Sequence, residues 1–216
     1  MSAPASTTWL MKLDIFGNVT QQQLACCNVQ TTTFGASNDY ALAESVTRGA
    51  SGGAQVTTSA GYDFNTSATQ TTTDPNGLVT TVNNRDAALR PTLITYPTNA
   101  TATASYNDDT QFVSKSITYN DAGSQKTVSG STVYDGEGRA IQQVDSNGGQ
   151  VNIRYDSMGR VASRTNPFPT GGTPGPSTSY TYDALGRSTV VTLPDPQTVQ
   201  TSYNGNTVTV TDQVLC

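Results

Sequence analysis

The residues best suited to chemistry in this sequence are aspartates and arginines that recur at a fixed spacing. Carboxylates repeated in this way could form the acid and base pair of a glycoside hydrolase. A catalytic site needs only one copy, so repetition favours a structural role instead. The hexad Tyr-Asp-x-x-Gly-Arg occurs three times, with the fixed positions Tyr134, Asp135, Gly138, Arg139, Tyr155, Asp156, Gly159, Arg160, Tyr182, Asp183, Gly186 and Arg187.

Other catalytic chemistry has few residues to draw on. The sequence contains no histidine, which removes Ser-His and Cys-His nucleophile pairs and the commonest zinc and iron ligand. Asp108 and Asp109 are neighbours and would point to opposite sides of a strand, so a solvated turn is favoured over a paired acid and base. We therefore expect no enzymatic activity and no cofactor.

Charge and hydropathy exclude several classes of partner. The net charge of −5 and the pI of about 4.5 disfavour binding to nucleic acid. We expect no membrane span, because there is no apolar run of about 18 residues. The first residues show no basic start followed by an apolar stretch, so no secretion signal is expected in this chain.

The three cysteines do not form a disulfide framework. Cys26 and Cys27 are adjacent, and Cys216 is the last residue. We expect Cys26 and Cys27 to lie on opposite faces of a strand. A vicinal redox pair or a metal ligand is the alternative, although no further Cys or His is nearby to complete a metal site.

The elements that must hold the hexads are predicted to be strands. Thr, Ser, Asn, Gln and Gly dominate, a mixture that favours strands and turns over helices. In residues 150–156, Val151, Ile153 and Tyr155 alternate with Asn152 and Arg154, as expected of two faces of a strand. Further along, Asn204-Gly205 predicts a two-residue hairpin loop.

The spacing of the strand-ending tyrosines predicts a repeat. Tyr134 and Tyr155 are 21 residues apart, as are Tyr182 and Tyr203, whereas Tyr155 and Tyr182 are 27 apart. The Pro/Gly-rich segment "NPFPTGGTPGPS" explains the longer interval as an insertion in a turn. Each unit is expected to add two antiparallel strands. Weaker copies precede these at 13–18, from Tyr62-Asp63, at 85–91, where Arg85 and Leu89 replace Tyr and Gly, and at 119–124.

This pattern predicts one continuous all-β array of antiparallel hairpin repeats, degenerate over 1–130 and clear over 131–216. Within a hexad, Asp156 should accept hydrogen bonds from the backbone ahead of it and Gly159 should adopt positive φ. Arg160 could then pair with an aspartate or lie over a tyrosine ring. The tyrosines would pack as a ladder in a protein whose core is thin, since only 34% of residues are hydrophobic.

The motif Tyr-Asp-x-x-Gly-Arg among Thr-rich strands resembles the YD repeat of the Rhs family, which includes bacterial Rhs polymorphic-toxin proteins, toxin-complex shell subunits and teneurins. The resemblance implies a spiralling β-sheet that closes as a hollow shell, often around a toxic C-terminal domain, in a secreted or cell-surface protein. "DPNGL" at 74–78 resembles the family's self-cleavage motif. It stands in mid-chain, and an ordinary turn is the favoured interpretation.

Three functions from different classes stay open on the sequence alone. The leading one is a non-catalytic segment of shell wall, whose partners are the remaining repeats of a parent protein and an enclosed toxin domain. The second is a carbohydrate-binding surface, in which exposed aromatic rings flanked by Asn, Gln and Asp face sugars. The third is a truncated gene fragment without independent function, whose open sheet edges would tend to associate.

Overall fold

A computed structural model describes residues 10–23, 28–50 and 52–212. The backbone forms two compact units, residues 1–103 with 118–126 and residues 104–117 with 127–216. We describe each unit by itself. The predicted contrast between residues 1–130 and 131–216 concerns the quality of the repeats and stays a prediction. Cys26, Cys27 and Cys216 lie outside the described residues.

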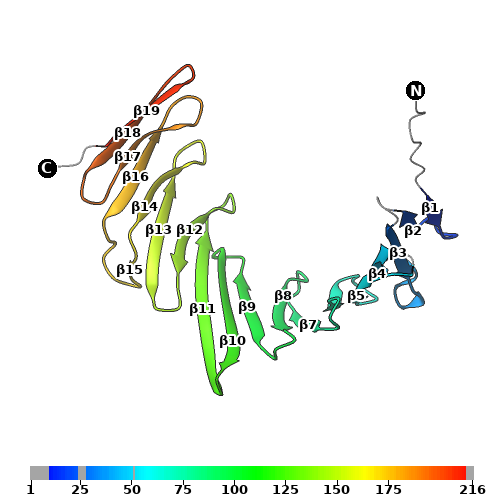
Figure 1. Ribbon diagram of the computed structural model, residues 1–216. Helices are drawn as coiled ribbons and strands as arrows, with labels where there is room; N and C mark the ends of the chain where they lie inside the picture. The colour runs from blue at the N-terminus through cyan, green and yellow to red at the C-terminus, as the bar shows by residue number, and fades with distance from the viewer. Residues whose placement is uncertain (1–9, 24–27, 51, 213–216) are drawn as a thin grey trace, which may run out of the picture. The chain divides into compact units, whose positions relative to one another are not determined.

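The first unit is a run of short strands joined by tight turns (Figure 1). A single 3-10 turn, η2 (Ala36–Asn38), interrupts its described part. Its strands are β1 (Met11–Leu13), β2 (Val19–Gln23), β3 (Asn28–Phe34), β4 (Ala43–Ala50), β5 (Gln55–Tyr62), β6 (Thr69–Thr73), β7 (Val79–Arg85) and β8 (Pro91–Thr95). Three further strands, β9 (Thr101–Asn107), β10 (Phe112–Asp121) and β11 (Ser124–Tyr134), have residues in both units.

The pairing register gives the first unit two unlike faces. Successive antiparallel pairings align Thr71, Thr81, Thr95 and Thr101 in one row across β6 to β9. On the opposite face, Val82, Ile94 and Ala102 are aligned in the same way. Hydroxyl side chains bond across strands, as between the Oγ1 atoms of Thr47 and Thr57 at 2.8 Å. The threonine-rich composition therefore satisfies its own polar groups on one side of the sheet.

The second unit repeats this arrangement (Figure 1). One row runs through Ser163, Ser179, Thr192 and Thr198, and the opposite face aligns Tyr180, Val191 and Val199. The remaining strands of the unit are β12 (Ala140–Val144), β13 (Gly149–Tyr155), β14 (Val161–Thr165), β15 (Phe168–Pro169), β16 (Ser177–Tyr182), β17 (Ser188–Thr192), β18 (Thr198–Asn204) and β19 (Thr207–Asp212).

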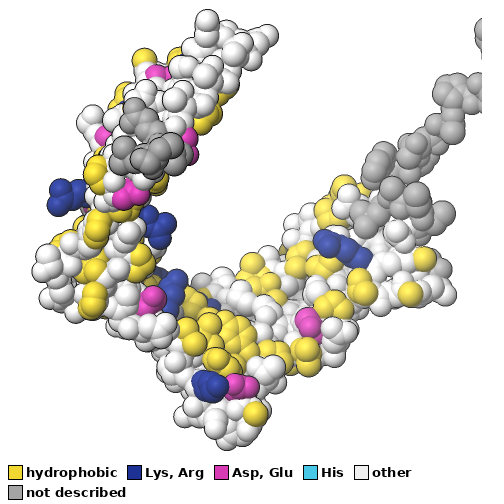
Figure 2. Space-filling view, turned by 60° about the vertical axis from the view of Figure 1, so that its left-hand side comes forward, with side chains coloured by type: hydrophobic (Ala, Val, Ile, Leu, Met, Phe, Trp, Pro, Cys, Tyr) yellow, Lys and Arg dark blue, Asp and Glu magenta, His cyan; other side chains and the backbone are white. Residues whose placement is uncertain are grey.

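The predicted all-β class and the antiparallel hairpin repeat are thus confirmed. Several units of sequence supply a five-residue strand followed by a seven-residue strand, as β12 with β13 and β17 with β18 do. The core is thin, because the buried hydrophobic residues in the described part of the chain are Ala100, Val151 and Phe168. Figure 2 shows hydrophobic side chains at the surface among polar ones. A single-layer sheet of this kind depends on cross-strand contacts more than on a buried interior.

The structure corrects two local predictions. The last hairpin loop is Gly205-Asn206, because Asn204 still pairs with Thr207. The prediction of Asn204-Gly205 was wrong by one residue, since Gly205 takes the first loop position with φ 55°, where type II′ turns place glycine.

The segment 119–124 is not a degenerate hexad. Here β10 and β11 are joined by a two-residue loop, Ala122-Gly123, with φ values of 49° and 86°. Two successive residues with positive φ are typical of a type I′ hairpin. Tyr119 and Gly123 therefore match the hexad spacing without forming its turn.

The Pro/Gly-rich insertion forms the connection between the paired strands β14 and β16, as predicted, and it adds one short pairing of its own. It contains β15, which pairs with Gly149 and Gln150 of β13, and Phe168 is only 7% exposed. Thr170 donates from both its N–H and its hydroxyl to the carbonyl of Gly148, each at 2.9 Å. The insertion thus pairs with the first two residues of β13, while β14 pairs with its last three residues.

Candidate functional site

Each hexad forms the same tight turn between two strands. In the second copy, the Gly159 N–H donates to the Asp156 carbonyl at 3.0 Å, and the Asp156 N–H donates to the Arg160 carbonyl at 2.8 Å. Gly159 has φ 78°, and the register shifts at Tyr155. This is a type I turn followed by a G1 bulge, in which a residue with positive φ is required. The other copies place Gly138 and Gly186 at φ 77° and 80°.

The aspartate side chain holds the turn from inside. One oxygen of Asp156, Oδ1, accepts the backbone N–H groups of Met158 and Arg160, both at 2.9 Å. The other oxygen, Oδ2, accepts from the Arg160 Nε at 2.7 Å. The Arg160 backbone N–H, opposed by partial desolvation and aided by the guanidinium, lowers the pKa of Asp156 below its ordinary value of 3.8. Asp135 and Asp183 are held in the same way.

The arginine of one hexad lies over the tyrosine of the next. The guanidinium carbon of Arg139 is 4.6 Å from the ring centroid of Tyr155, that of Arg160 is 4.5 Å from Tyr182, and that of Arg187 is 4.1 Å from Tyr203. Such cation–π contacts are worth about 0.5–1 kcal/mol each at exposed sites. The sequence left a choice between an aspartate and a tyrosine as partner, and the structure shows the arginine using both.

The hydroxyls of Tyr155, Tyr182 and Tyr203 also bond to the residue that follows the preceding hexad. Tyr155 donates to the carbonyl of Ala140 at 3.0 Å, the residue directly after Arg139. Tyr182 donates to the corresponding carbonyl of Val161 at 2.8 Å, and Tyr203 to that of Ser188 at 3.1 Å. The tyrosine and the preceding hexad are therefore joined at two points, one through the ring and one through the hydroxyl.

The degenerate copy at 85–90 keeps the turn but has an arginine in place of the tyrosine that bonds to an earlier strand. Asp86 accepts from the backbone N–H groups of Ala88 and Arg90 and from the Arg90 guanidinium. Leu89 occupies the glycine position with φ 63°. Arg85 stands where the other copies have tyrosine, and its guanidinium donates to the carbonyl of Thr69, the first residue of β6. The arginine thus bonds the backbone position that a tyrosine hydroxyl bonds elsewhere.

The copy at 13–18 uses aromatic stacking instead of an arginine. Asp14 accepts from the N–H groups of Phe16 and Asn18, and the Asn18 side chain donates both to Asp14 and to the carbonyl of Tyr40. The rings of Phe16 and Tyr40 are stacked, with centroids 5.5 Å apart and planes 19° apart. Phe34 occupies the strand-end position, where the register again shifts.

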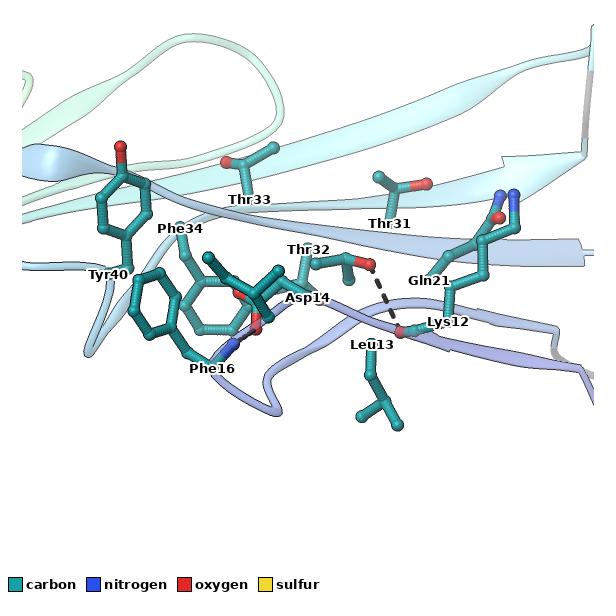
Figure 3. A pocket seen from close by; sticks show the side chains of 12 residues that line it. Lys12, Leu13, Asp14, Phe16, Gln21, Thr31, Thr32, Thr33, Phe34 and Tyr40 are labelled. Carbon is teal, nitrogen blue, oxygen red and sulfur yellow. Dashed lines mark hydrogen bonds between the residues drawn. The ribbon is translucent and has the colours of Figure 1, made fainter.

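These aromatic residues line an open groove of about 980 Å³ (Figure 3). Figure 3 shows the Phe16, Phe34 and Tyr40 rings grouped at one end, while Leu13 points away. At the other end, the Thr20 hydroxyl donates to the Lys12 carbonyl at 3.3 Å. The groove is lined by these aromatic rings, by threonines, Gln21 and Lys12, and by Asp14, whose two oxygens accept hydrogen bonds within the turn.

The turns at the other end of the strands follow the same rule, which the sequence reading missed. Asp74 and Asp145 each accept two backbone N–H groups through Oδ1. Gly77 and Gly148 supply the positive φ, at 78° and 77°. The segment "DPNGL" at 74–78 is therefore an ordinary turn of the array, as favoured from the sequence. The offset of Asp and Gly could have revealed these turns, since only the tyrosine and the arginine are absent.

The arrangement offers little for catalysis. Among the described residues, no three His, Cys, Asp or Glu side chains are grouped to hold a metal ion. Asp108 and Asp109 lie in an exposed turn, as predicted. Each hexad aspartate is ion-paired to its own arginine, which favours the charged carboxylate over a proton-transfer role. In the part of the chain that is described, no helix is long and apolar enough to cross a membrane.

Two of the hexad tyrosines already make contacts within the sheet. In Tyr155 and Tyr182, an arginine covers one face of the ring and the hydroxyl is bonded to a backbone carbonyl. A sugar would therefore compete with these contacts for one ring face and the hydroxyl. The carbohydrate-binding alternative stays a prediction.

Comparison with known proteins agrees with this geometry. Residues 134–173 match the model of the RHS repeat family, which confirms the Rhs-type resemblance drawn from the sequence. The fold is similar to the crystal structure of TcdB2-TccC3, with a TM-score of 0.74 at 15% identity over 95% of this chain. The structure of TcdB2-TccC3-Cdc42 gives a TM-score of 0.51 at 15% identity over 94% of this chain.

The match covers only a small part of those larger chains. This chain spans 14% of the first and 10% of the second. The comparison with curated proteins found no match. The structural likeness establishes the fold, a run of antiparallel hairpins, and leaves function to be argued from the residues.

Proposed function

We propose that this chain is a non-catalytic segment of β-repeat wall in a secreted or cell-surface YD-repeat protein. The wall belongs to a shell that encloses a toxin or effector domain, and the partners of this segment are the neighbouring repeats and that enclosed domain. The RHS repeat at 134–173 and the fold shared with TcdB2-TccC3 support this proposal.

The observation that favours a wall is that the Asp, Arg and Tyr side chains of the hexads are used in contacts within the sheet. In the clear hexads, the Asp135, Asp156 and Asp183 carboxylates hold turns, the arginines hold tyrosines and the tyrosines hold backbone carbonyls. The carboxylates hold each turn together, and the arginine and tyrosine contacts join one turn to the next. A repeat whose polar side chains bind mainly to neighbouring repeats can be stacked into a long sheet, and a shell wall requires such a sheet.

Electron microscopy of the parent protein tests the proposal. We expect a hollow particle in which an enclosed domain is protected from added protease. The variant Gly159→Val should reduce the fraction of closed particles and expose the enclosed domain, while the matched variant Met158→Gln, in the same turn, should leave both unchanged. A parent protein that forms no hollow particle would refute the wall function.

A further inference from the structure

The chain contains three Asn-Gly pairs, and this dipeptide has a spontaneous chemistry of its own. The backbone nitrogen of the glycine can attack the side-chain carbonyl carbon of the asparagine, because the two atoms are held close enough to close a five-membered ring. Glycine leaves the nitrogen unobstructed, since it has no side chain. The pairs are Asn76-Gly77, Asn147-Gly148 and Asn204-Gly205.

Access does not distinguish the three pairs. All three asparagines are exposed, and each of the three glycines has open space where a side chain would begin. Each glycine also has positive φ, at 78° for Gly77, 77° for Gly148 and 55° for Gly205. A difference in reactivity must therefore come from the hydrogen bonds that the attacking nitrogen makes in the folded chain.

Two of the attacking nitrogens are held by an aspartate turn. The Gly77 N–H donates to the Asp74 carbonyl at 3.0 Å. The Gly148 N–H donates to the Asp145 carbonyl at 3.1 Å. The asparagine before each glycine is held as well, because its own N–H donates to Oδ1 of the same aspartate, at 2.8 Å in the first turn and 2.9 Å in the second. Attack would break the glycine bond and, since the nitrogen must lose its proton, would place a negative charge near a carboxylate.

The third nitrogen is not held in this way. Gly205 is the first of the two loop residues between β18 and β19, and the loop is closed by the pairing of Asn204 with Thr207. In a four-residue β-turn the closing bond joins the first carbonyl to the last N–H, so the N–H of the second residue is not used. Among the described residues, no hydrogen bond uses the Gly205 N–H. This nitrogen can therefore attack without breaking a bond of its own.

We propose that Asn204 is a site of spontaneous deamidation, and that the aspartates of the repeat turns protect Asn76 and Asn147 from the same reaction. The Gly205 nitrogen loses its proton and bonds to Cγ of Asn204, and the side-chain nitrogen of Asn204 takes up a proton and leaves as ammonia. Water then opens the cyclic imide at either carbonyl, which leaves an aspartyl or an isoaspartyl residue. Water is the only co-reactant.

The isoaspartyl product would alter the hairpin of β18 and β19. In this product the main chain runs through the former side chain and is longer by a methylene group. It also carries a negative charge in place of a neutral amide. The backbone groups of Asn204 that pair with Thr207 are then displaced. The ladder should open at the loop, while pairs further from it, such as Thr201 with Val210, remain.

The test is the rate at which each asparagine is lost when the full chain is kept in mildly alkaline buffer. Samples taken over time are digested and analysed by mass spectrometry, with electron-transfer fragmentation to separate isoaspartyl from aspartyl products. We expect Asn204 to convert at least about fivefold faster than Asn76 and Asn147, since each held nitrogen must first give up a hydrogen bond. In urea, where the turns are lost, the three rates should converge. Equal rates in the folded chain, or the same order of rates in urea, would overturn the proposal.

The protecting role is tested by a matched pair of variants. Asp145→Ala removes the acceptor of the Asn147 N–H and the nearby charge, so Asn147 should convert several-fold faster while the rate at Asn204 stays the same. Asp156→Ala is the control, because it removes the same contact from a turn that contains no asparagine, and it should leave both rates unchanged. An unchanged rate at Asn147 in Asp145→Ala, or an equal rise in the control, would contradict protection by the turn.

Discussion

The clear hexads around Tyr155 and Tyr182 and the degenerate copies around Asp14 and Asp86 differ in how they are linked, and agree in how they turn. Every one of them keeps an aspartate that accepts backbone N–H groups and a residue with positive φ three positions later. The Arg–Tyr link is replaced by Phe16–Tyr40 stacking in one copy. In these copies the turn is therefore the part of the repeat that changes least, whereas the link has several chemical solutions.

The largest effect should come from substituting the glycine that the turn requires. Gly159→Val places a β-branched residue at φ 78°, and its Cβ would lie 3.1 Å from the Arg139 Nη1. We expect a loss of about 2–3 kcal/mol of stability, measured by urea unfolding. If Gly159→Val unfolded at the urea midpoint of the unmodified chain, the turn assignment would be wrong.

Removing the carboxylate should have the next largest effect. Asp156→Ala leaves two backbone N–H groups and the Arg160 guanidinium without their acceptor, so the melting temperature should fall, by less than in Gly159→Val. Asp109→Ala, in an exposed turn, is the control and should change little. Equal effects of the two variants would contradict the role given to Asp156.

The same carboxylates predict loss of stability in acid. The pKa values of Asp86, Asp135, Asp156 and Asp183 are lowered in the folded chain, so their contribution is complete above the ordinary value of 3.8 and is lost as pH falls through the lower folded values. Urea midpoints should be constant near neutral pH and fall below about pH 4. In Asp156→Ala this fall should be smaller.

The link can be weakened without disturbing the turn. Tyr155→Phe removes the hydroxyl that donates to Ala140 and leaves the ring beneath Arg139, so we expect a loss of about 1 kcal/mol in urea unfolding. In the degenerate copy, Arg85→Tyr should be nearly neutral, because either side chain can donate to the Thr69 carbonyl. A large loss in Arg85→Tyr would show that the two anchors are not equivalent.

The smallest effects should separate the variable positions from the fixed ones. Met158 is 73% exposed, and Met158→Gln should change stability by no more than about 0.5 kcal/mol. Leu89→Gly relieves the positive φ of the degenerate copy and should stabilise it by about 1 kcal/mol, opposite in sign to Gly159→Val. Thermal unfolding of both variants checks the contrast.

The sequence predicted the hairpin array because its signals are local. Alternation in β13 and the Asp–Gly offset act over a few residues, and turn chemistry fixes them. The arginine over the following tyrosine depends on which strands are neighbours, so the sequence could name the candidates but not choose between them. The strand β15 and the burial of Phe168 were not predicted, because a two-residue strand among prolines and glycines has no alternation pattern. The role of Arg85 was not predicted, because a sequence does not show that an arginine and a tyrosine donate to the same backbone carbonyl position.

The contact between each arginine and the next tyrosine has an evolutionary consequence. In the clear hexads each arginine contacts the strand-ending tyrosine that follows it, and none of these contacts depends on a shared centre. A duplication or deletion of one whole unit in the gene therefore leaves each remaining arginine beside a tyrosine. Such a protein can change its length in steps of one repeat while its rules of assembly stay the same.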